Sequence, residues 1–165
     1  MYQFRPATLE DAQTINDIYN DAIETTNATF DTVAKPLSFR EQWLAVRQVN
    51  HPVLVAEEDD RVVGWASLNS YDARDAYRRT AEISIYIHNE ARGKGLGRDL
   101  MNAILAAGRD TELLTVIARI TVDNEASIRL HENAGFQKVG VLKGVGEKFG
   151  QLLDVSIMQR TLTDG

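Results

Sequence analysis

The stretch Arg92-Gly93-Lys94-Gly95-Leu96-Gly97 decides the fold, because three glycines and two cations lie between a strand-like segment, 82–87, and a helix-like segment, 98–107. Alternate glycines let backbone N–H groups approach an anion without a Cβ in the way. The helix that follows adds its own unpaired N–H groups and the positive end of its dipole. This combination predicts a loop that binds the phosphate groups of a cofactor.

Two familiar phosphate-binding loops do not match this stretch. A Walker A loop requires Lys followed by Ser or Thr after its last glycine, whereas Arg98 and Asp99 follow Gly97 here. A dinucleotide fingerprint would have a third glycine where Arg98 stands, and normally occurs in the first βα unit of its domain. A glycine-rich turn without a ligand is the remaining alternative, and the flanking cations count against it.

Composition excludes several classes of protein. The chain has 165 residues, of which 44% are hydrophobic, so we expect one compact domain over residues 1–165. The formal net charge of −6 and the lack of a long basic tract argue against nucleic-acid binding. Without cysteine there is no disulfide, thiolate metal site or cysteine nucleophile, and we expect no metal. Since no long apolar run or leader segment is found, we expect a cytoplasmic protein that binds no membrane.

The spacing of apolar residues indicates the order of the secondary-structure elements. Helical periodicity predicts helices at 8–25, 38–48, 98–107 and 124–134. In the second helix, Phe39, Trp43 and Val46 are expected to face the core. Alternating or β-branched segments predict strands at 2–5, 53–57, 62–68, 81–87, 115–122, 136–142 and 152–162. This order is typical of an α/β or α+β domain with a mixed sheet.

The order of elements, together with the loop, resembles the GNAT superfamily of N-acetyltransferases. That family binds acetyl-CoA through Gln or Arg, two residues, Gly, one residue, and then Gly or Ala, and residues 92–97 match this pattern. The resemblance implies a mostly antiparallel central sheet flanked by helices, with acetyl-CoA as cosubstrate and no metal. The helix and strand that border the pantetheine in the family are matched by Asn124, Ser127, His131, Gly135 and Phe136.

A narrower resemblance covers most of the chain. Segment 145–150 is similar to methionine sulfoximine and methionine sulfone acetyltransferases. In phosphinothricin N-acetyltransferases a His follows the residue matching Lys148, whereas Phe149 stands there in this chain. The resemblance implies an amino-acid-like small-molecule acceptor and a homodimer, with pockets completed near the interface. The segments that resemble phosphinothricin N-acetyltransferases are 23–30, 71–77, 80–82 and 130–136.

Glu82 is the candidate general base. Acetyl transfer to an amine needs a base, because an ammonium must lose a proton before it can attack. Glu82 lies among apolar neighbours in the strand that leads to the glycine loop. An exposed carboxylate, or a partner for Arg78 or Arg79, is the structural alternative. The resemblance favours the base, because the matching glutamate is the proposed base in phosphinothricin acetyltransferases.

His131 is the second candidate catalytic residue. It stands where many GNAT enzymes carry a Tyr that protonates the departing thiolate of CoA. A histidine could do the same, or could relay the proton of the amine through water. A helix histidine bonded to a backbone group is the plain alternative.

The resemblance also implies the cofactor site. Backbone N–H groups of the central strand, at residues 85–87, are expected to stabilise the oxyanion of acyl transfer. Asn124 is expected to reach the pantetheine, or simply to cap its helix. The expected cofactor-binding residues are Ile85, Tyr86, Ile87, Arg92, Gly93, Lys94, Gly95, Leu96, Gly97, Arg98 and Asn124.

An α-amino-acid acceptor demands a cation for its carboxylate. Arg74, with Tyr77 nearby, supplies a guanidinium and a phenol in the loop before Glu82. Phe30 is a candidate wall of the side-chain pocket, although a loop phenylalanine also fits a plain packing role. The expected substrate-binding residues are therefore Phe30, Arg74, Tyr77 and Glu82.

The expected function is transfer of the acetyl group of acetyl-CoA to the α-amine of a small amino-acid analogue, of the phosphinothricin, methionine sulfoximine or methionine sulfone type. Direct attack in a ternary complex is expected, since there is no cysteine and no serine in a nucleophile elbow. Two alternatives remain open. One is a GNAT enzyme for another amine, such as a protein N-terminus, a polyamine or an aminoglycoside. The other is a non-catalytic acyl-CoA sensor.

Overall fold

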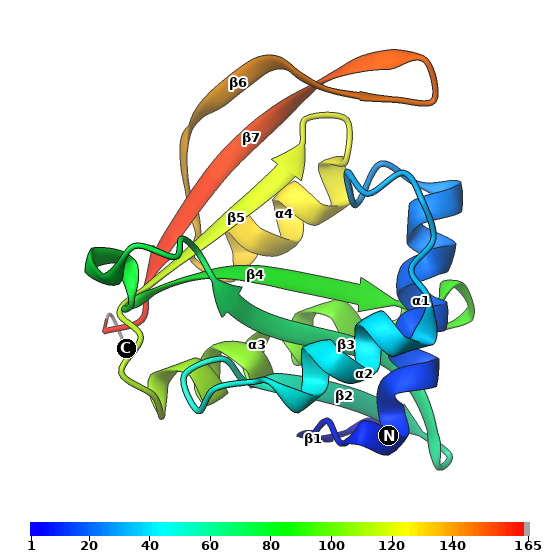
Figure 1. Cartoon of the computed structure of the whole chain (residues 1–165). Coiled ribbons are helices and arrows are strands. Elements are labelled where there is room, and N and C mark those ends of the chain that lie inside the picture. Colours follow the sequence, from blue (N-terminus) through cyan, green and yellow to red (C-terminus); the bar gives the residue numbers. More distant parts are fainter. Residues whose placement is uncertain (164–165) are drawn as a thin grey trace.

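The computed structural model describes residues 1–163, which form a seven-stranded sheet with helices on both faces (Figure 1). The strand order is β1-β2-β3-β4-β5-β7-β6, and β4 with β5 is the parallel pair among otherwise antiparallel neighbours. This arrangement confirms the predicted fold class. The strands are β1 (Gln3–Pro6), β2 (Val53–Glu58), β3 (Arg61–Ser70), β4 (Thr80–Ile87), β5 (Thr115–Thr121), β6 (Gln137–Lys148) and β7 (Gln151–Thr161).

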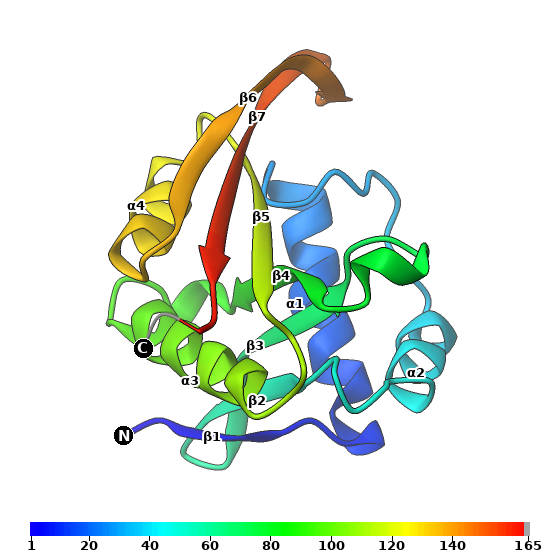
Figure 2. The same cartoon turned by 90° about the vertical axis from the view of Figure 1, so that its left-hand side faces the viewer.

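The helices cover the two faces of the sheet in pairs. Figure 2 shows α1 and α2 on one face, and α3 and α4 on the other. The α-helices are α1 (Ala12–Thr25), α2 (Leu37–Ala45), α3 (Leu96–Arg109) and α4 (Glu125–Asn133). Three short 3-10 helices are η1 (Leu9–Asp11), η2 (Asp75–Tyr77) and η3 (Asn89–Ala91). Each predicted helix and strand is present, with its ends shifted by a few residues.

The strand β6 departs most from its predicted length, since it extends to Lys148 rather than ending near Leu142. The pairing with β7 continues to Lys148, which lies opposite Gln151. A tight turn then joins the two strands, with φ of 52° at Phe149 and 71° at Gly150. The β6–β7 hairpin rises as an arm above the rest of the sheet (Figures 1 and 2).

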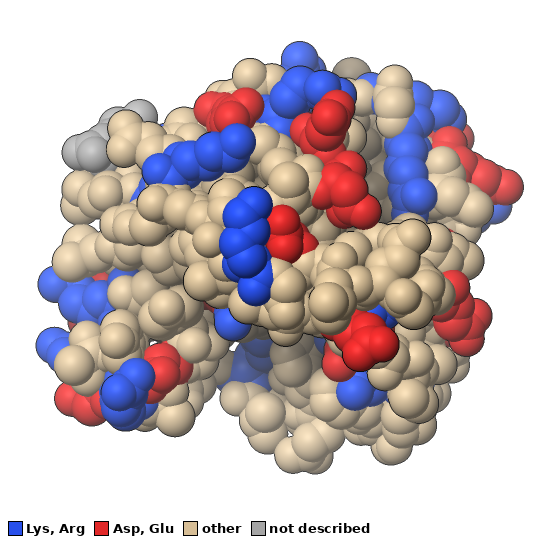
Figure 3. All heavy atoms as spheres, turned by 90° about the horizontal axis from the view of Figure 1, so that it is seen from above, with Lys and Arg blue, Asp and Glu red and all other residues tan. Residues whose placement is uncertain are grey.

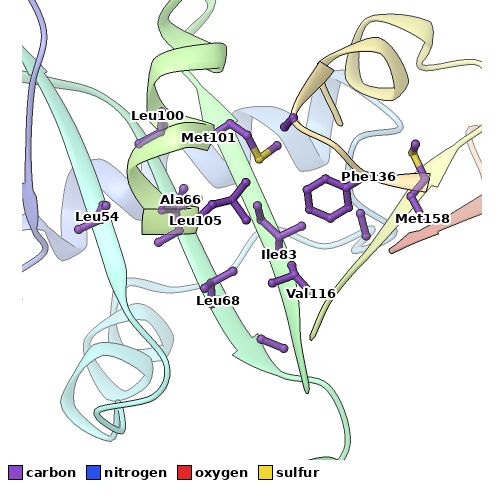
Figure 4. Packing of buried hydrophobic residues seen from close by; sticks show 14 of the residues in the cluster. Leu54, Ala66, Leu68, Ile83, Leu100, Met101, Leu105, Val116, Phe136 and Met158 are labelled. Carbon is purple, nitrogen blue, oxygen red and sulfur yellow. The ribbon is translucent and has the colours of Figure 1, made fainter. Parts of the chain in front are cut away.

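The main core lies between the sheet and α3. Leu100, Met101, Ile104 and Leu105 form the buried face of α3, as the helical periodicity predicted. Burial of these side chains holds α3, and with it the loop that precedes α3, against the sheet. Figure 4 shows this cluster, in which the labelled residues are Leu54, Ala66, Leu68, Ile83, Leu100, Met101, Leu105, Val116, Phe136 and Met158.

A second core lies on the opposite face, beneath α1 and α2, and differs from prediction. Phe39 and Val46, which we expected to face inward, are exposed, whereas Trp43 does pack against this core. The buried residue of α2 is Arg40, whose guanidinium lies 4.5 Å from the ring centroid of Trp43 and 4.9 Å from that of Tyr19. Cation–π attraction explains why a cation occupies the inward face of the helix. The buried residues of this cluster are Ile15, Ile18, Val53, Val55 and Trp65.

No helix within residues 1–163 is both long enough and apolar enough to cross a membrane. The same residues contain no group of three or more His, Asp or Glu side chains placed to hold a metal ion.

Candidate functional site

A cavity of about 1030 Å³ opens where β4 and β5 part. The two strands pair only from Thr80 with Thr115 to Glu82 with Ile117. Beyond that point their facing edges separate, and residues 83–87 and 118–121 line the cavity from its two sides. Figure 3 shows the upper face of the molecule, which is hollowed between two lobes and carries interspersed basic and acidic side chains.

Two glycines of the glycine loop adopt a backbone conformation that favours glycine. Gly93 has φ of 73° and Gly95 has φ of 87°, in the left-handed region that side chains with a Cβ rarely occupy. Within residues 1–163, the backbone N–H groups of residues 93–95 donate no hydrogen bond. The first N–H groups of α3, which begins at Leu96, add to this unpaired set. These amides can therefore receive a phosphate group.

Only part of the glycine loop, residues 92–97, lines the cavity. Arg92, Gly93 and Gly97 line the cavity, whereas Lys94, Gly95, Leu96 and Arg98 are not among its lining residues. The Nε of Arg92 donates to the carbonyl oxygen of Ile87 at 3.1 Å, which ties the loop to the end of β4. A Cβ on Gly97 would lie 3.3 Å from Ile87 Cδ1, so the third glycine permits close packing of α3 on β4.

Glu82 lies at the point where the strands part and lines the cavity. Its partner is neither Arg78 nor Arg79 but Arg119, on β5, whose Nε donates to Glu82 Oε2 at 2.8 Å. The Nη2 of Arg119 donates to the same oxygen. Sequence reasoning missed Arg119, because a lone arginine inside a β-branched strand shows no sign of its partner.

His131 is almost fully buried at the cavity wall, against the ring of Phe136. Its Nδ1 lies 2.7 Å from the carbonyl oxygen of Ser127, which can only accept, so Nδ1 carries the hydrogen and Nε2 keeps a lone pair. Burial holds the pKa of His131 below its ordinary value, although the bond to Ser127 acts in the opposite direction. A neutral imidazole of this kind can accept a hydrogen bond at Nε2 but has no proton to donate from that atom.

Asn124 and three residues of β4 also line the cavity. The side-chain oxygen of Asn124 accepts from the backbone N–H of Ser127 at 3.2 Å, so this residue caps α4 while it lines the cavity. Ile85, Tyr86 and Ile87 line the cavity on the β4 side, along the edge from which β5 has separated. Backbone groups on that edge have no strand partner, and apart from the carbonyl oxygen of Ile87, which accepts from Arg92, they can contact a ligand.

Phe30 forms part of the cavity wall together with Leu142 and Val145 of the arm. A Cβ on Gly146 would overlap the ring of Phe30, so this ring lies directly against the backbone of β6. The loop that carries Phe30 is also held by Lys148, whose buried Nζ donates to the carbonyl oxygen of Thr29 at 2.8 Å. Burial lowers the pKa of the Lys148 ammonium.

Arg74 and Tyr77 lie outside the cavity. Arg74 is exposed, and its Nε donates to Oδ1 of Asp72 at 2.9 Å, while its guanidinium lies 5.1 Å from the ring centroid of Tyr77. The structure therefore does not bring these two residues together with Glu82 at the cavity, and their role with the acceptor stays a prediction.

The family profile of the Acetyltransferase (GNAT) domain matches residues 4–157 of this chain. The chain belongs to the GNAT acetyltransferases. Acetyltransferases of this family use acetyl-CoA, and this one is an acetyl-CoA-dependent enzyme of the same kind. Its site fits that cosubstrate, because the unpaired amides of residues 93–95 suit the phosphates and the parted strands offer free backbone groups beside them.

Two curated relatives and one solved structure show how far this acetyltransferase resembles known proteins. The L-methionine sulfoximine/L-methionine sulfone acetyltransferase of Salmonella typhimurium is 37% identical, over 97% of this chain and 94% of the relative. The L-amino acid N-acyltransferase MnaT of Escherichia coli is 36% identical, with the same coverage of 97% and 94%. The structure of a phosphinothricin acetyltransferase from Sinorhizobium meliloti in complex with acetyl-CoA matches with a TM-score of 0.93 and 31% identity, over 97% of this chain and 88% of that one.

Gly95→Val tests the glycine loop of this acetyltransferase. Valine at a φ of 87° is strained by about 1–2 kcal/mol, and the loop must rearrange to relieve that strain. We expect acetyl-CoA to bind at least about tenfold more weakly, as measured by isothermal titration calorimetry. Gly140→Val is the control, because Gly140 lies on β6 with no neighbour near its Cβ position and no positive φ. An unchanged dissociation constant for Gly95→Val would contradict the phosphate-loop interpretation.

The lowered pKa of His131 predicts a pH dependence of stability. Below about pH 6.5 the imidazole of His131 is protonated in the unfolded chain but still neutral in the folded protein. The free energy of unfolding therefore decreases as the pH falls toward the pKa of folded His131. His131→Gln should remove this part of the decrease between about pH 7.5 and 5.5, measured by urea unfolding. The same substitution at the exposed His88 is the control. If wild type and His131→Gln lose equal stability over this range, the burial of a neutral imidazole is refuted.

Proposed function

We propose that the protein transfers the acetyl group of acetyl-CoA to the α-amine of a small amino-acid analogue, by direct attack within a ternary complex. Methionine sulfone, methionine sulfoximine and phosphinothricin are the proposed acceptors. The observation that carries this proposal is the position of Glu82, a carboxylate on the cavity wall at the point where β4 and β5 part. An acceptor amine in the cavity lies between this carboxylate and the edge of β4.

The residues of the chain have separate roles in this reaction. Amides of residues 93–97 hold the phosphates of the cosubstrate, which supplies the acetyl thioester when bound. Glu82 Oε1 accepts no hydrogen bond within residues 1–163, so it is available to take the proton of the acceptor ammonium. Neutral His131, with the lone pair of Nε2 free, suits a proton relay better than donation to a thiolate.

The walls at the acceptor end suit a short side chain with an apolar stem. Phe30, Leu142 and Val145 line this end of the cavity. The charged side chains that line the cavity are Glu82, Asp123, Arg92 and Arg119, so its lining is balanced rather than acidic. A polyamine or an aminoglycoside, with several positive charges, would favour an acidic lining. The balance of charge therefore supports an amino-acid analogue over these alternatives.

The proposal includes a single domain that works in the cytoplasm, as length and composition predict, and that forms a homodimer, as the resemblance implies. The dimer is supported by apolar side chains that the β6–β7 arm exposes to solvent, which include Val139, Val145, Phe149 and Leu152. A second copy of the chain that covered this arm would remove these side chains from water.

An acceptor panel tests the proposed function. Release of CoA is followed with a thiol reagent, to which this cysteine-free protein adds no background. The panel contains phosphinothricin, methionine sulfoximine, methionine sulfone, common amino acids, spermidine and an aminoglycoside. We expect saturable turnover confined to amino acids and their analogues. Turnover of spermidine or the aminoglycoside alone would favour another amine, and acetyl-CoA binding without any turnover would favour a sensor.

Glu82→Gln tests the general base. Glutamine keeps the size of the side chain and an oxygen for Arg119 but cannot take up a proton at neutral pH. We expect kcat to fall by about 10² to 10⁴, with the acetyl-CoA dissociation constant close to that of wild type. A kcat within about twofold of wild type across the pH profile would exclude Glu82 as the base.

A further inference from the structure

The ion pair of Glu82 with Arg119 uses only one oxygen of the carboxylate and one edge of the guanidinium. Both hydrogen bonds run from Nε and Nη2 of Arg119 to one oxygen, Oε2 of Glu82. Within residues 1–163, Nη1 of Arg119 donates no hydrogen bond and Oε1 of Glu82 accepts none. The side edge of the guanidinium is thus occupied, while its end edge, Nη1 with the remaining hydrogen of Nη2, stays open to a second carboxylate.

The pair lies across the opening between the strands. Glu82 is the last residue of β4 that pairs with β5, where it lies opposite Ile117. Arg119 is two residues further along β5, so its side chain is on the same face as that of Glu82. The side chain of Arg119 is 53% exposed and that of Glu82 is 25% exposed, and both line the cavity. A small molecule that enters the cavity can therefore contact both groups.

Arg119 is the cation placed nearest to the candidate base. Among the residues described as lining the cavity, the cations are Arg92 and Arg119. Arg92 lies at the glycine loop, where its Nε is bonded to the carbonyl oxygen of Ile87. Arg74 lies outside the cavity, and both its Nε and its Nη2 donate to Asp72.

We infer that Arg119 binds the carboxylate of the acceptor while Glu82 receives its ammonium. This inference rests on the proposed function. An α-amino acid carries its ammonium and its carboxylate on one carbon, so its recognition requires an anion and a cation side by side. Glu82 Oε1 and the end edge of Arg119 provide this arrangement, because the bonds between the two side chains hold them together.

This assignment makes Arg119 a specificity-determining residue with two effects. Its side edge fixes the carboxylate of Glu82 before an acceptor arrives, which reduces the ordering that binding requires. Its end edge favours acceptors with a carboxylate next to the amine. When an amine without that carboxylate binds, the N–H groups at the end edge of Arg119 stay hydrogen-bonded to water and add nothing to its affinity.

The test compares Arg119→Met with Arg74→Met, which removes the arginine that lies outside the cavity. Methionine sulfone is the first acceptor, and 3-(methylsulfonyl)propylamine, the same molecule without its carboxylate, is the second. For Arg119→Met we expect the KM of methionine sulfone to rise about 10- to 100-fold, and that of the amine, which loses only the ordering of Glu82, to rise by less than about fivefold. Arg119→Lys, which keeps the charge but not the planar donor pair, should give an intermediate rise.

A second measurement does not depend on turnover of the amine. Methionine sulfone without its amine, 4-(methylsulfonyl)butanoate, should inhibit wild type competitively and should inhibit Arg119→Met at least about tenfold more weakly. Thermal melting and the acetyl-CoA dissociation constant establish that each variant is folded and binds the cosubstrate.

The outcomes separate this inference from the proposed function. If wild type acetylates no amino acid or analogue, the proposed function itself is wrong. If wild type does so, and Arg119→Met loses affinity equally for both acceptors or keeps its inhibition by the butanoate, the assignment of Arg119 is overturned. A selective loss in Arg74→Met instead would assign the carboxylate to Arg74, as the sequence predicted.

Discussion

The parting of β4 and β5 is the constraint on which the rest of the site depends. Parallel neighbours cannot be joined by a short turn, so α3 crosses one face of the sheet between them. Their pairing stops at Glu82, and the backbone groups beyond it lose the ladder that would otherwise satisfy them. A ligand that enters this gap finds unpaired backbone groups on a strand whose position the core on α3 holds firmly.

The glycine loop and the helices could be predicted from the sequence, because the residues that determine them are close together in the chain. Positive φ at Gly93 and Gly95 requires a residue without a Cβ, and the amphipathic spacing on α3 depends only on its own residues. The candidate base also follows from local features together with the family resemblance. The length of β6 was harder to predict, because its pairing with β7 overrides the local preference of its glycines.

The contacts between distant residues could not be predicted in the same way. Glu82 and Arg119 are 37 residues apart, and their meeting depends on the register of β4 against β5. A pattern of alternation gives the face of a strand but not the partner across it. Arg40 is a similar case, since its burial depends on aromatic rings from other elements, including Tyr19 and Trp65. The place of Arg74, outside the cavity, likewise depends on how its loop folds rather than on its closeness to Glu82 in sequence.

The two ends of the cavity are lined by different parts of the chain. The phosphate end is made largely of backbone, whereas the acceptor end is made of side chains from the Phe30 loop and from β6. Because any Cβ at position 146 would overlap the ring at position 30, a change at one of these positions alters what the other tolerates. A mutational path that introduces a side chain at position 146 is therefore restricted in its order, because the ring of Phe30 has to move aside or be replaced by a smaller residue first.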